Sequence, residues 1–240
     1  MKKMKMILLI FPAVLFAQND FTNGPQYGFF EINIGQHTVS KDSAIFDFSE
    51  ETLTFDASDL DSLDLSLGMY WQRSNLLAFG LMMQQYKEST QSEDLEYVFE
   101  DLSPIIQATE LETGWFGFEA VVTPFGAGEF FGNRAWAPKA FVPFLKVGVG
   151  ITDWAFVQYG DFVDYETETV FNDEYLSEGT TTSMTGTLGF RVKISPRMDL
   201  NFSITKIWAE DNLDSSDFSG FGDLDLSSKS ASLGLSVKLF

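Results

Sequence analysis

The 240-residue sequence contains no cysteine, one histidine, and only 15 lysine and arginine residues against 35 aspartate and glutamate residues. The lack of cysteine excludes a disulfide framework, a thiolate metal site, a cysteine nucleophile and a lipid-modified N-terminal cysteine. The formal net charge of −20 argues against a nucleic-acid partner, because such proteins need a basic surface to displace counterions from phosphates. We therefore expect no nucleic acid among the partners.

Long apolar runs are also scarce. The run at Ile7–Phe16 follows three lysines within the first five residues and precedes the small residue Ala17. This order is typical of a secretory signal, and the run is about half the roughly 20 residues that a membrane-spanning helix needs. We expect residues 1–17 to be a signal peptide and residues 18–240 to form one domain outside the cytoplasm.

Apolar residues are nevertheless abundant: they make up 45% of the chain, and 25 residues are phenylalanine. After the N-terminal segment they alternate with polar residues at a period of two, which indicates strands. One face of each stretch carries large apolar side chains, and the other mixes glycine, serine, threonine, asparagine and glutamine with a few charges. Eight stretches of about ten residues show this pattern: 27–39, 63–71, 77–84, 110–122, 141–152, 182–194, 200–208 and 229–239.

The predicted connections between these stretches are of two kinds. The links 73–76, 123–140 and 195–199 are candidates for one end of the structure. The links 40–58, 88–108, 153–180 and 209–227 are long, and they hold 25 of the 35 acidic residues but only one basic residue, Lys41. The negative charge is therefore expected at a single rim.

Small residues on the polar faces suit the crowded interior of an eight-stranded barrel better than the exterior of a soluble sheet. Strands of about ten residues also match the length of a tilted membrane-spanning strand. We predict an all-β fold, an eight-stranded antiparallel up-and-down transmembrane β-barrel. A soluble lipocalin-like barrel or a sandwich is the alternative.

The whole region after the signal peptide resembles a known group, the small eight-stranded outer-membrane β-barrels of the OmpA, OmpX and OmpW type, and two stretches carry the resemblance most clearly. The segment Phe141–Gly150 is similar to the strand of that group that combines aromatic residues with Gly-x-Gly. The C-terminal segment resembles the terminal signal read by the barrel-assembly machinery, with the signal residues Leu235, Val237, Leu239 and Phe240. The resemblance implies a bacterial outer-membrane location, with outer-membrane lipids, lipopolysaccharide and the assembly machinery as partners.

Five charged residues share the polar faces in the half of the barrel nearer the short links: Glu31, Glu119, Lys146, Arg191 and Lys193. Charges of both signs at one depth in a narrow interior are expected to pair, because an isolated buried charge is costly. We predict an internal ion-pair network that plugs the barrel. The alternative is that these side chains lie in different sectors and contact water in the lumen.

Three tryptophans, Trp71, Trp154 and Trp208, fall near predicted strand ends, where indole rings prefer a membrane interface. We predict that they form an interface girdle. Lys206 shares parity with Trp208, so its stem can extend along apolar surface toward a lipid phosphate.

The acidic links raise the question of metal binding. The residues concerned are Asp211, Asp214, Asp217, Asp223 and Asp225, which lack the spacing of an EF-hand loop. We therefore predict no dedicated metal site and no cofactor, and we treat divalent cations only as possible partners of an acidic rim.

Catalysis has little support in the sequence. The single histidine, His37, has Ser40 and Asp42 nearby, but residues three apart on a strand point to opposite faces. We predict a non-enzymatic outer-membrane barrel with an envelope-structural or surface-interaction role. The first alternative is a narrow passive channel lined by Met82, Phe144 and Phe29. A lipid A-modifying enzyme is the second alternative.

Overall fold

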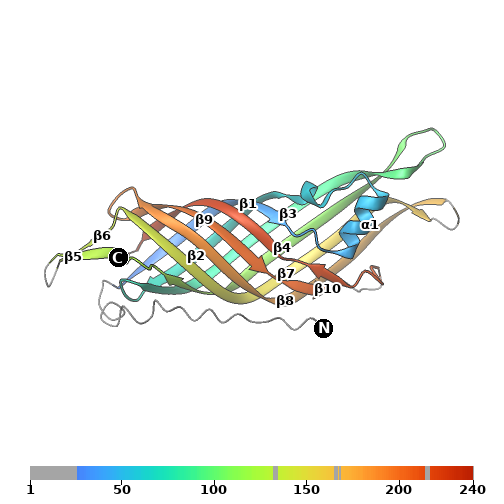
Figure 1. The fold of residues 1–240 in the computed structure, drawn as a ribbon. Coiled ribbons are helices and arrows are strands. Elements are labelled where there is room, and N and C mark those ends of the chain that lie inside the picture. The colour runs from blue at the N-terminus through green and yellow to red at the C-terminus, as the bar shows by residue number, and fades with distance from the viewer. Residues whose placement is uncertain (1–25, 132–134, 165–166, 168, 214–216, 240) are drawn as a thin grey trace.

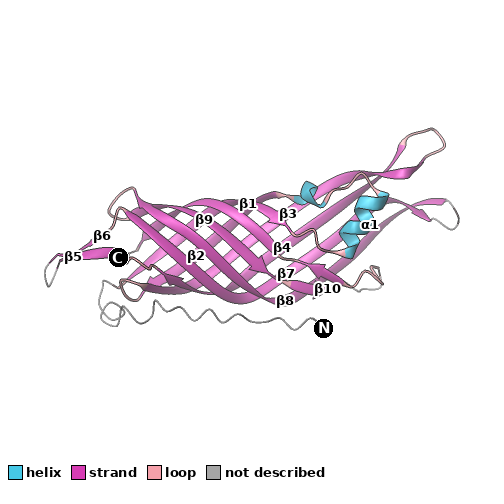
Figure 2. Cartoon of the chain, viewed as in Figure 1, coloured by secondary structure: helices cyan, strands magenta, loops and turns pink. Residues whose placement is uncertain are grey.

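The computed structural model describes residues 26–131, 135–164, 167, 169–213 and 217–239, so the predicted signal peptide and Phe240 lie outside the described residues. Eight strands form a closed antiparallel barrel in the order β1-β12-β9-β8-β7-β4-β3-β2 (Figure 1 and Figure 2). This ring confirms the predicted all-β, eight-stranded fold. The barrel strands are β1 (Tyr27–Val39), β2 (Ser62–Gln72), β3 (Leu77–Val98), β4 (Pro104–Val122), β7 (Phe141–Asp164), β8 (Thr169–Lys193), β9 (Met198–Trp208) and β12 (Ser228–Lys238).

The remaining elements are short and lie in the connections. The link after β1 contains helix α1 (Ala44–Thr52) and the 3-10 helix η2 (Ala57–Leu60). The link between β4 and β7 contains the small hairpin β5 (Gly128–Phe131) and β6 (Ala135–Pro138). The link before β12 contains β10 (Glu210–Asn212) and β11 (Asp223–Asp225). Among the described residues, no helix is long and apolar enough to cross a membrane.

Alternation along the strands separates the interior from the exterior. On β1, Glu31 and Asn33 are buried inside the barrel, whereas Ile32 and Ile34 are exposed on its outer surface. The register continues this separation sideways, because Ile32 pairs with Leu67 of β2 and with Leu235 of β12. Apolar side chains therefore cover the outside, and the polar faces predicted from the sequence point inward.

Two predicted loops are largely strand. β3 and β4 stay paired well past residue 88, and β7 and β8 stay paired up to Asp164 and Thr169. The predictions for 88–108 and 153–180 were therefore wrong over most of their length. Beyond the apolar surface the outward face of these ribbons carries polar residues such as Lys87, Glu112 and Asp153, so no outward apolar stripe marks them as strands in the sequence.

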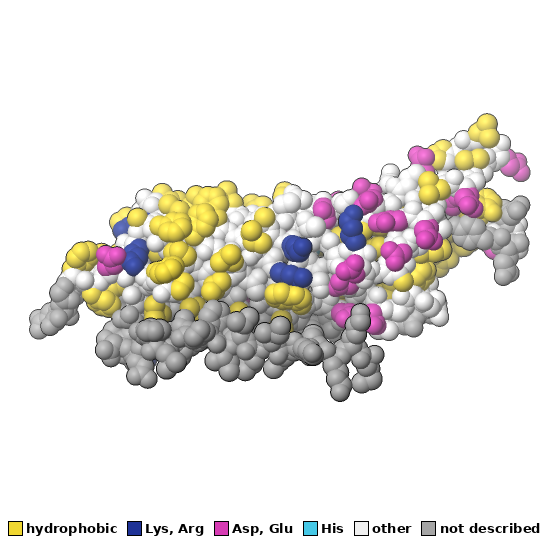
Figure 3. Space-filling model, viewed as in Figure 1, with side chains coloured by type: hydrophobic (Ala, Val, Ile, Leu, Met, Phe, Trp, Pro, Cys, Tyr) yellow, Lys and Arg dark blue, Asp and Glu magenta, His cyan; other side chains and the backbone are white. Residues whose placement is uncertain are grey.

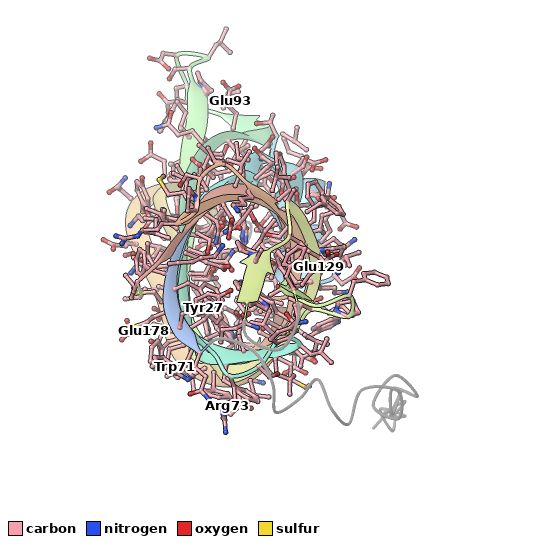
Figure 4. The ribbon with its side chains drawn as sticks, turned by 90° about the vertical axis from the view of Figure 1, so that its left-hand side faces the viewer. Tyr27, Trp71, Arg73, Glu93, Glu129 and Glu178 are labelled. Carbon is pink, nitrogen blue, oxygen red and sulfur yellow. The ribbon has the colours of Figure 1, made fainter. Side chains whose placement is uncertain are left out.

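The two ends of the barrel differ in chemistry. Apolar side chains cover the half nearer the short links, and aspartate and glutamate side chains gather toward the half with the long hairpins (Figure 3). We call these the short-turn end and the acidic end. The view from the short-turn end shows a ring of strands with side chains filling its centre (Figure 4).

The tight interior gives a first prediction, at Gly189 of β8. A Cβ atom added there would lie 2.5 Å from the ring of Phe144 and 2.5 Å from the backbone oxygen of Phe202. We expect Gly189→Val to lower the free energy of unfolding by about 1–3 kcal/mol, the usual range for overpacking. Ala231→Val, on the outer face, is the control and should change it by less than about 0.5 kcal/mol. The urea dependence of the folded band on unheated SDS gels measures both variants, and equal stability for the two would contradict the tight packing.

Candidate functional site

The half of the interior nearer the short-turn end holds a compact group of charged side chains. Glu31 of β1 accepts a hydrogen bond from the Lys146 ammonium at 2.5 Å and two from the Arg191 guanidinium at 2.8 and 3.1 Å. Lys146 also donates to the Tyr70 hydroxyl at 2.9 Å and lies 3.9 Å from a Glu119 carboxylate oxygen. We call Glu31, Tyr70, Glu119, Lys146 and Arg191 the inner network.

The inner network has two positive and two negative side chains, and each is nearly inaccessible to solvent, with at most 8% of the side chain exposed. Tyr70 donates a hydrogen bond to Glu119 at 2.5 Å, and Thr185 donates to the other oxygen of Glu119 at 3.3 Å. Buried charges are tolerated when they are paired and hydrogen-bonded, and this group meets both conditions.

Aromatic rings enclose the two cations. The Arg191 guanidinium lies 4.5 Å from the ring centroid of Phe29 and 4.8 Å from that of Phe144. The Lys146 ammonium lies 4.4 Å from the ring centroid of Tyr70. Rings at these distances attract a cation through their quadrupoles, and they also fill space that water would otherwise occupy.

The structure brings together four of the five charged residues predicted for this network. Lys193 lies apart, because it is one inward position closer to the short-turn end and pairs in register with Asp199 of β9. The sequence reasoning missed Tyr70, which bridges Lys146 and Glu119. Tyr70 alternates onto the same strand face as Ser66 and Gly68, and this alternation could have assigned it to the barrel interior.

A second polar group lies above the inner network. The carboxylate of Asp64 accepts a hydrogen bond from Gln84 at 2.5 Å and lies 3.3 Å from Nδ1 of His37. The His37 ring stacks on Tyr86 at a centroid distance of 4.0 Å. A cavity of only about 20 Å³ remains beside this group, which is room for about one water molecule.

The acidic end of the interior is filled by apolar side chains from two links. Ile45 and Phe46 of α1 and Leu60 of η2 are buried there, against Phe156 of β7 and Phe218 of the last link. We call this cluster the outer plug. Its members are Val39, Ile45, Phe46, Leu53, Phe55, Ala57, Leu60, Met82, Tyr86, Leu111, Trp115, Trp154, Phe156, Ile207, Ala209, Leu213, Phe218, Leu224 and Leu226.

Hydrogen bonds join the two links of the outer plug to each other and to the barrel wall. Ser40 donates to the carboxylate of Asp225 at 2.6 Å, and the backbone N–H of Asp225 donates to the Ser43 hydroxyl at 2.9 Å. The Tyr86 hydroxyl donates to the backbone oxygen of Leu60. The first link and the last link are therefore tied together across the barrel mouth.

The exposed side of the first link carries a surface ion pair. The Lys41 ammonium lies 2.7 Å from Asp56, and the Ser58 hydroxyl and N–H also donate to that carboxylate. These hydrogen bonds hold the pKa of Asp56 well below its usual value. Because both side chains are more than half exposed, this pair contributes little to stability.

Two of the three predicted girdle tryptophans face outward. Trp71 lies near the short-turn end of β2, and Trp208 lies at the acidic end of β9, each about half exposed. The prediction for Trp154 was wrong: its ring is buried in the outer plug, and its indole N–H donates to Asp211 at 2.8 Å. β7 continues past the predicted end at residue 152, so strand parity turns Trp154 inward.

The predicted assembly signal lies at the C-terminal end of β12. Leu235 and Val237 are partly exposed on its outer face, and Leu239 follows the strand, while Phe240 lies outside the described residues. The acidic links contain no group of three or more histidine, aspartate or glutamate side chains placed to hold a metal ion in the part of the chain that the structure describes. Asp214 also lies outside that part.

The inner network generates a second prediction. We expect Lys146→Met to lower the free energy of unfolding by about 3–5 kcal/mol, because Glu119 and Glu31 then share a single buried cation. The double variant Lys146→Met with Glu119→Gln should recover part of this loss, since one positive and one negative charge remain. Urea titration of the folded band measures both variants, and an equal loss in the two would contradict the charge-balance explanation.

The outer plug generates a third prediction, with two residues of α1 as a matched pair. Phe46 is buried against Phe55 and Phe156, whereas Phe48 is 43% exposed. Replacing a buried phenylalanine by alanine costs about 3–5 kcal/mol, so Phe46→Ala should open the first link to thermolysin. Phe48→Ala should be cut at nearly the wild-type rate, and the rate of proteolysis of the folded barrel distinguishes the two. Equal protection in both variants would mean that Phe46 does not hold the plug.

Similar folds are found among solved structures only. No protein-family model matches the sequence, and no curated protein matches it significantly. Among solved structures, the chain is similar to Neisserial surface protein A (11% identity, 90% of this chain and 100% of that chain, TM-score 0.49). It is also similar to Ail, the attachment invasion locus protein of Yersinia pestis, solved with the heparin analogue sucrose octasulfate (11%, 90% and 100%, 0.44), and to the outer membrane protein OprG from Pseudomonas aeruginosa (16%, 90% and 98%, 0.44). The chain itself is a closed eight-stranded antiparallel barrel, and these outer-membrane proteins are what it is similar to.

Proposed function

We propose that this protein is a non-enzymatic barrel of the bacterial outer membrane whose sealed interior supports an acidic extracellular surface. The observation that carries the proposal is closure of the interior at two levels, by the inner network and by the outer plug. The role that follows is structural support of the envelope, or contact with partners at the acidic end.

The outer surface supports a membrane location. Large apolar side chains point outward on all eight strands, including Ile34, Leu81, Phe118 and Ile204. Exposing so many of them to water would be costly, whereas a lipid environment matches them. Closing β1 against β12 also pairs the backbone groups of the sheet edge, as a spanning structure requires in hydrocarbon.

The long hairpins support the orientation. Outer-membrane barrels have short turns on the periplasmic side and longer loops outside. In this chain the short-turn end carries the β2–β3 and β8–β9 turns, and the acidic end carries the extended β3–β4 and β7–β8 hairpins (Figure 1). We therefore place the acidic end outside the cell.

The passive-channel alternative receives less support. Its predicted lining residues Phe29 and Phe144 are 1% exposed, and Met82 is 7% exposed, so these side chains fill the lumen. Phe29 and Phe144 enclose Arg191, and Met82 belongs to the outer plug. A path for solutes would have to open the charged layer and the apolar layer together.

The enzymatic alternative also receives less support. His37 lies beside Asp64, not beside Ser40 or Asp42, and only 2% of its side chain is exposed. Among the described residues no serine hydroxyl forms a hydrogen bond with the His37 ring. A lipid substrate would need both a nucleophile and a route to that ring.

Planar bilayer conductance tests the proposal and gives a fourth prediction. The wild-type barrel should show no steady conductance, because two seals lie in series. Loosening the plug with Phe46→Ala, or the inner network with Lys146→Ala and Glu119→Ala, should leave the barrel closed. The variant that combines all three substitutions should conduct.

The controls separate closure from failed insertion. A water-filled porin in the same bilayers provides the positive signal, and the heat-dependent gel shift shows that each variant is folded. A steady open pore in the wild-type protein would overturn the sealed-barrel proposal and favour the channel.

A further inference from the structure

Two lysines face each other on the outside of the barrel. Lys206 of β9 and Lys229 of β12 are directly opposite in register. Both have outward parity, since the preceding outward pair toward the short-turn end is Ile204 opposite Ala231. Like charges directly opposite on one sheet face repel, so the fold keeps an unfavourable pair at this position.

The neighbours of the pair do not neutralise it. The residues paired with the two lysines on their other sides are uncharged: Gly186 of β8 lies opposite Lys206, and Thr38 of β1 lies opposite Lys229. In the described part of the chain, no carboxylate oxygen lies within 4 Å of either lysine ammonium. By contrast, Lys87, also on the outer face, lies 2.6 Å from Glu110.

A groove of about 420 Å³ lies over the two lysines. Trp208 forms one side of it, with its ring centroid 5.3 Å from the Lys206 ammonium and its ring covering Gly186. Asp42 and Asp225 also line the groove. The Asp225 carboxylate already accepts hydrogen bonds from the Ser40 hydroxyl and the backbone N–H of Ser227.

We propose that Lys206 and Lys229, with Trp208 beside them, bind the phosphate monoester of a lipid in the outer leaflet of the membrane. The inference rests on the proposed function, because a lipid reaches this groove only if the barrel spans a membrane with its acidic end outside. It adds a specific binding site to that function.

Three observations favour this occupant. A phosphate monoester carries a charge near −2 at neutral pH, which matches two ammonium groups, whereas a phosphodiester carries only one charge. The lysines lie near the end of the apolar surface, with Met184 of β8 and Trp208 of β9 exposed one outward position beyond them, so they are close to the level of lipid headgroups, which long lysine stems reach readily. The Trp208 indole supports the same level, because indole rings prefer the interface between membrane and water.

The charge of the acidic end argues against a soluble anion at this site. Most of the acidic residues of the chain belong to the connections and extended hairpins of the acidic end, so an anion that approaches from the extracellular solution is repelled. A phosphate that belongs to a membrane lipid arrives along the bilayer and avoids most of that field.

Lipid binding to the barrel in phosphatidylcholine nanodiscs tests the inference. The probes are diphosphorylated lipid A, its dephosphorylated form and phosphatidylglycerol, and native mass spectrometry measures the bound fraction. The double variant Lys206→Gln with Lys229→Gln should bind diphosphorylated lipid A about 30-fold more weakly, because each lysine near an anionic lipid contributes about fivefold.

The matched control is Lys87→Gln with Lys139→Gln, which removes the same charge from two lysines that contact carboxylates. It should bind like the wild type. Equal binding by the Lys206/Lys229 variant and the wild type would overturn the site. Equal binding of dephosphorylated lipid A, or of phosphatidylglycerol, by the wild type would overturn the phosphate monoester as its ligand.

Failure of the proposed function is visible before any lipid is added. A chain that shows no heat-dependent gel shift in nanodiscs is not a membrane barrel, and this result would overturn both proposals. An inserted barrel that conducts but still loses lipid A in the double variant would overturn the sealed-barrel role and support the lipid site.

Discussion

The interior of this barrel is organised around the bonds of Glu31 to Lys146 and Arg191. In the ring of eight strands, β1 lies directly across from β7, so the Glu31–Lys146 pair spans the lumen. The Arg191 pair extends the connection to β8. One carboxylate therefore joins the first strand to strands that follow more than one hundred residues later, and the surrounding rings and hydroxyls are placed so that no charge is left uncompensated.

The interior could be predicted from the sequence wherever strand parity was clear. Glu31, Glu119, Lys146 and Arg191 alternate with large apolar residues, and alternation alone assigns them to the inside. Their pairing follows from the narrow lumen. Parity does not give the register between strands, so it cannot tell which of the inward residues Arg191 and Lys193 lies level with Glu31. In the structure it is Arg191, and Lys193 lies one inward position closer to the short-turn end.

The acidic end was harder to predict because the physical signal changes there. Where the strands leave the apolar surface their outward faces become polar, so the extensions of β3 and β7 look like loops in the sequence. The same error placed Trp154 in the girdle. The outer plug left a signal that went unused: Ile45, Phe46 and Phe55 are large apolar residues within an otherwise acidic link, and such residues need a buried surface.

The order of chemistries on the outer surface defines where a membrane fits. Apolar side chains come first from the short-turn end, then Lys206 and Lys229 with Met184 and Trp208 one position beyond them, and then the carboxylates. If the membrane boundary were one row closer to the acidic end, Lys206 and Lys229 would enter hydrocarbon, where lysine is costly. If it were one row lower, Ile204, which is 61% exposed, would meet water. The two lysines therefore lie close to the membrane boundary, and an anionic headgroup at that level would also remove the repulsion between them.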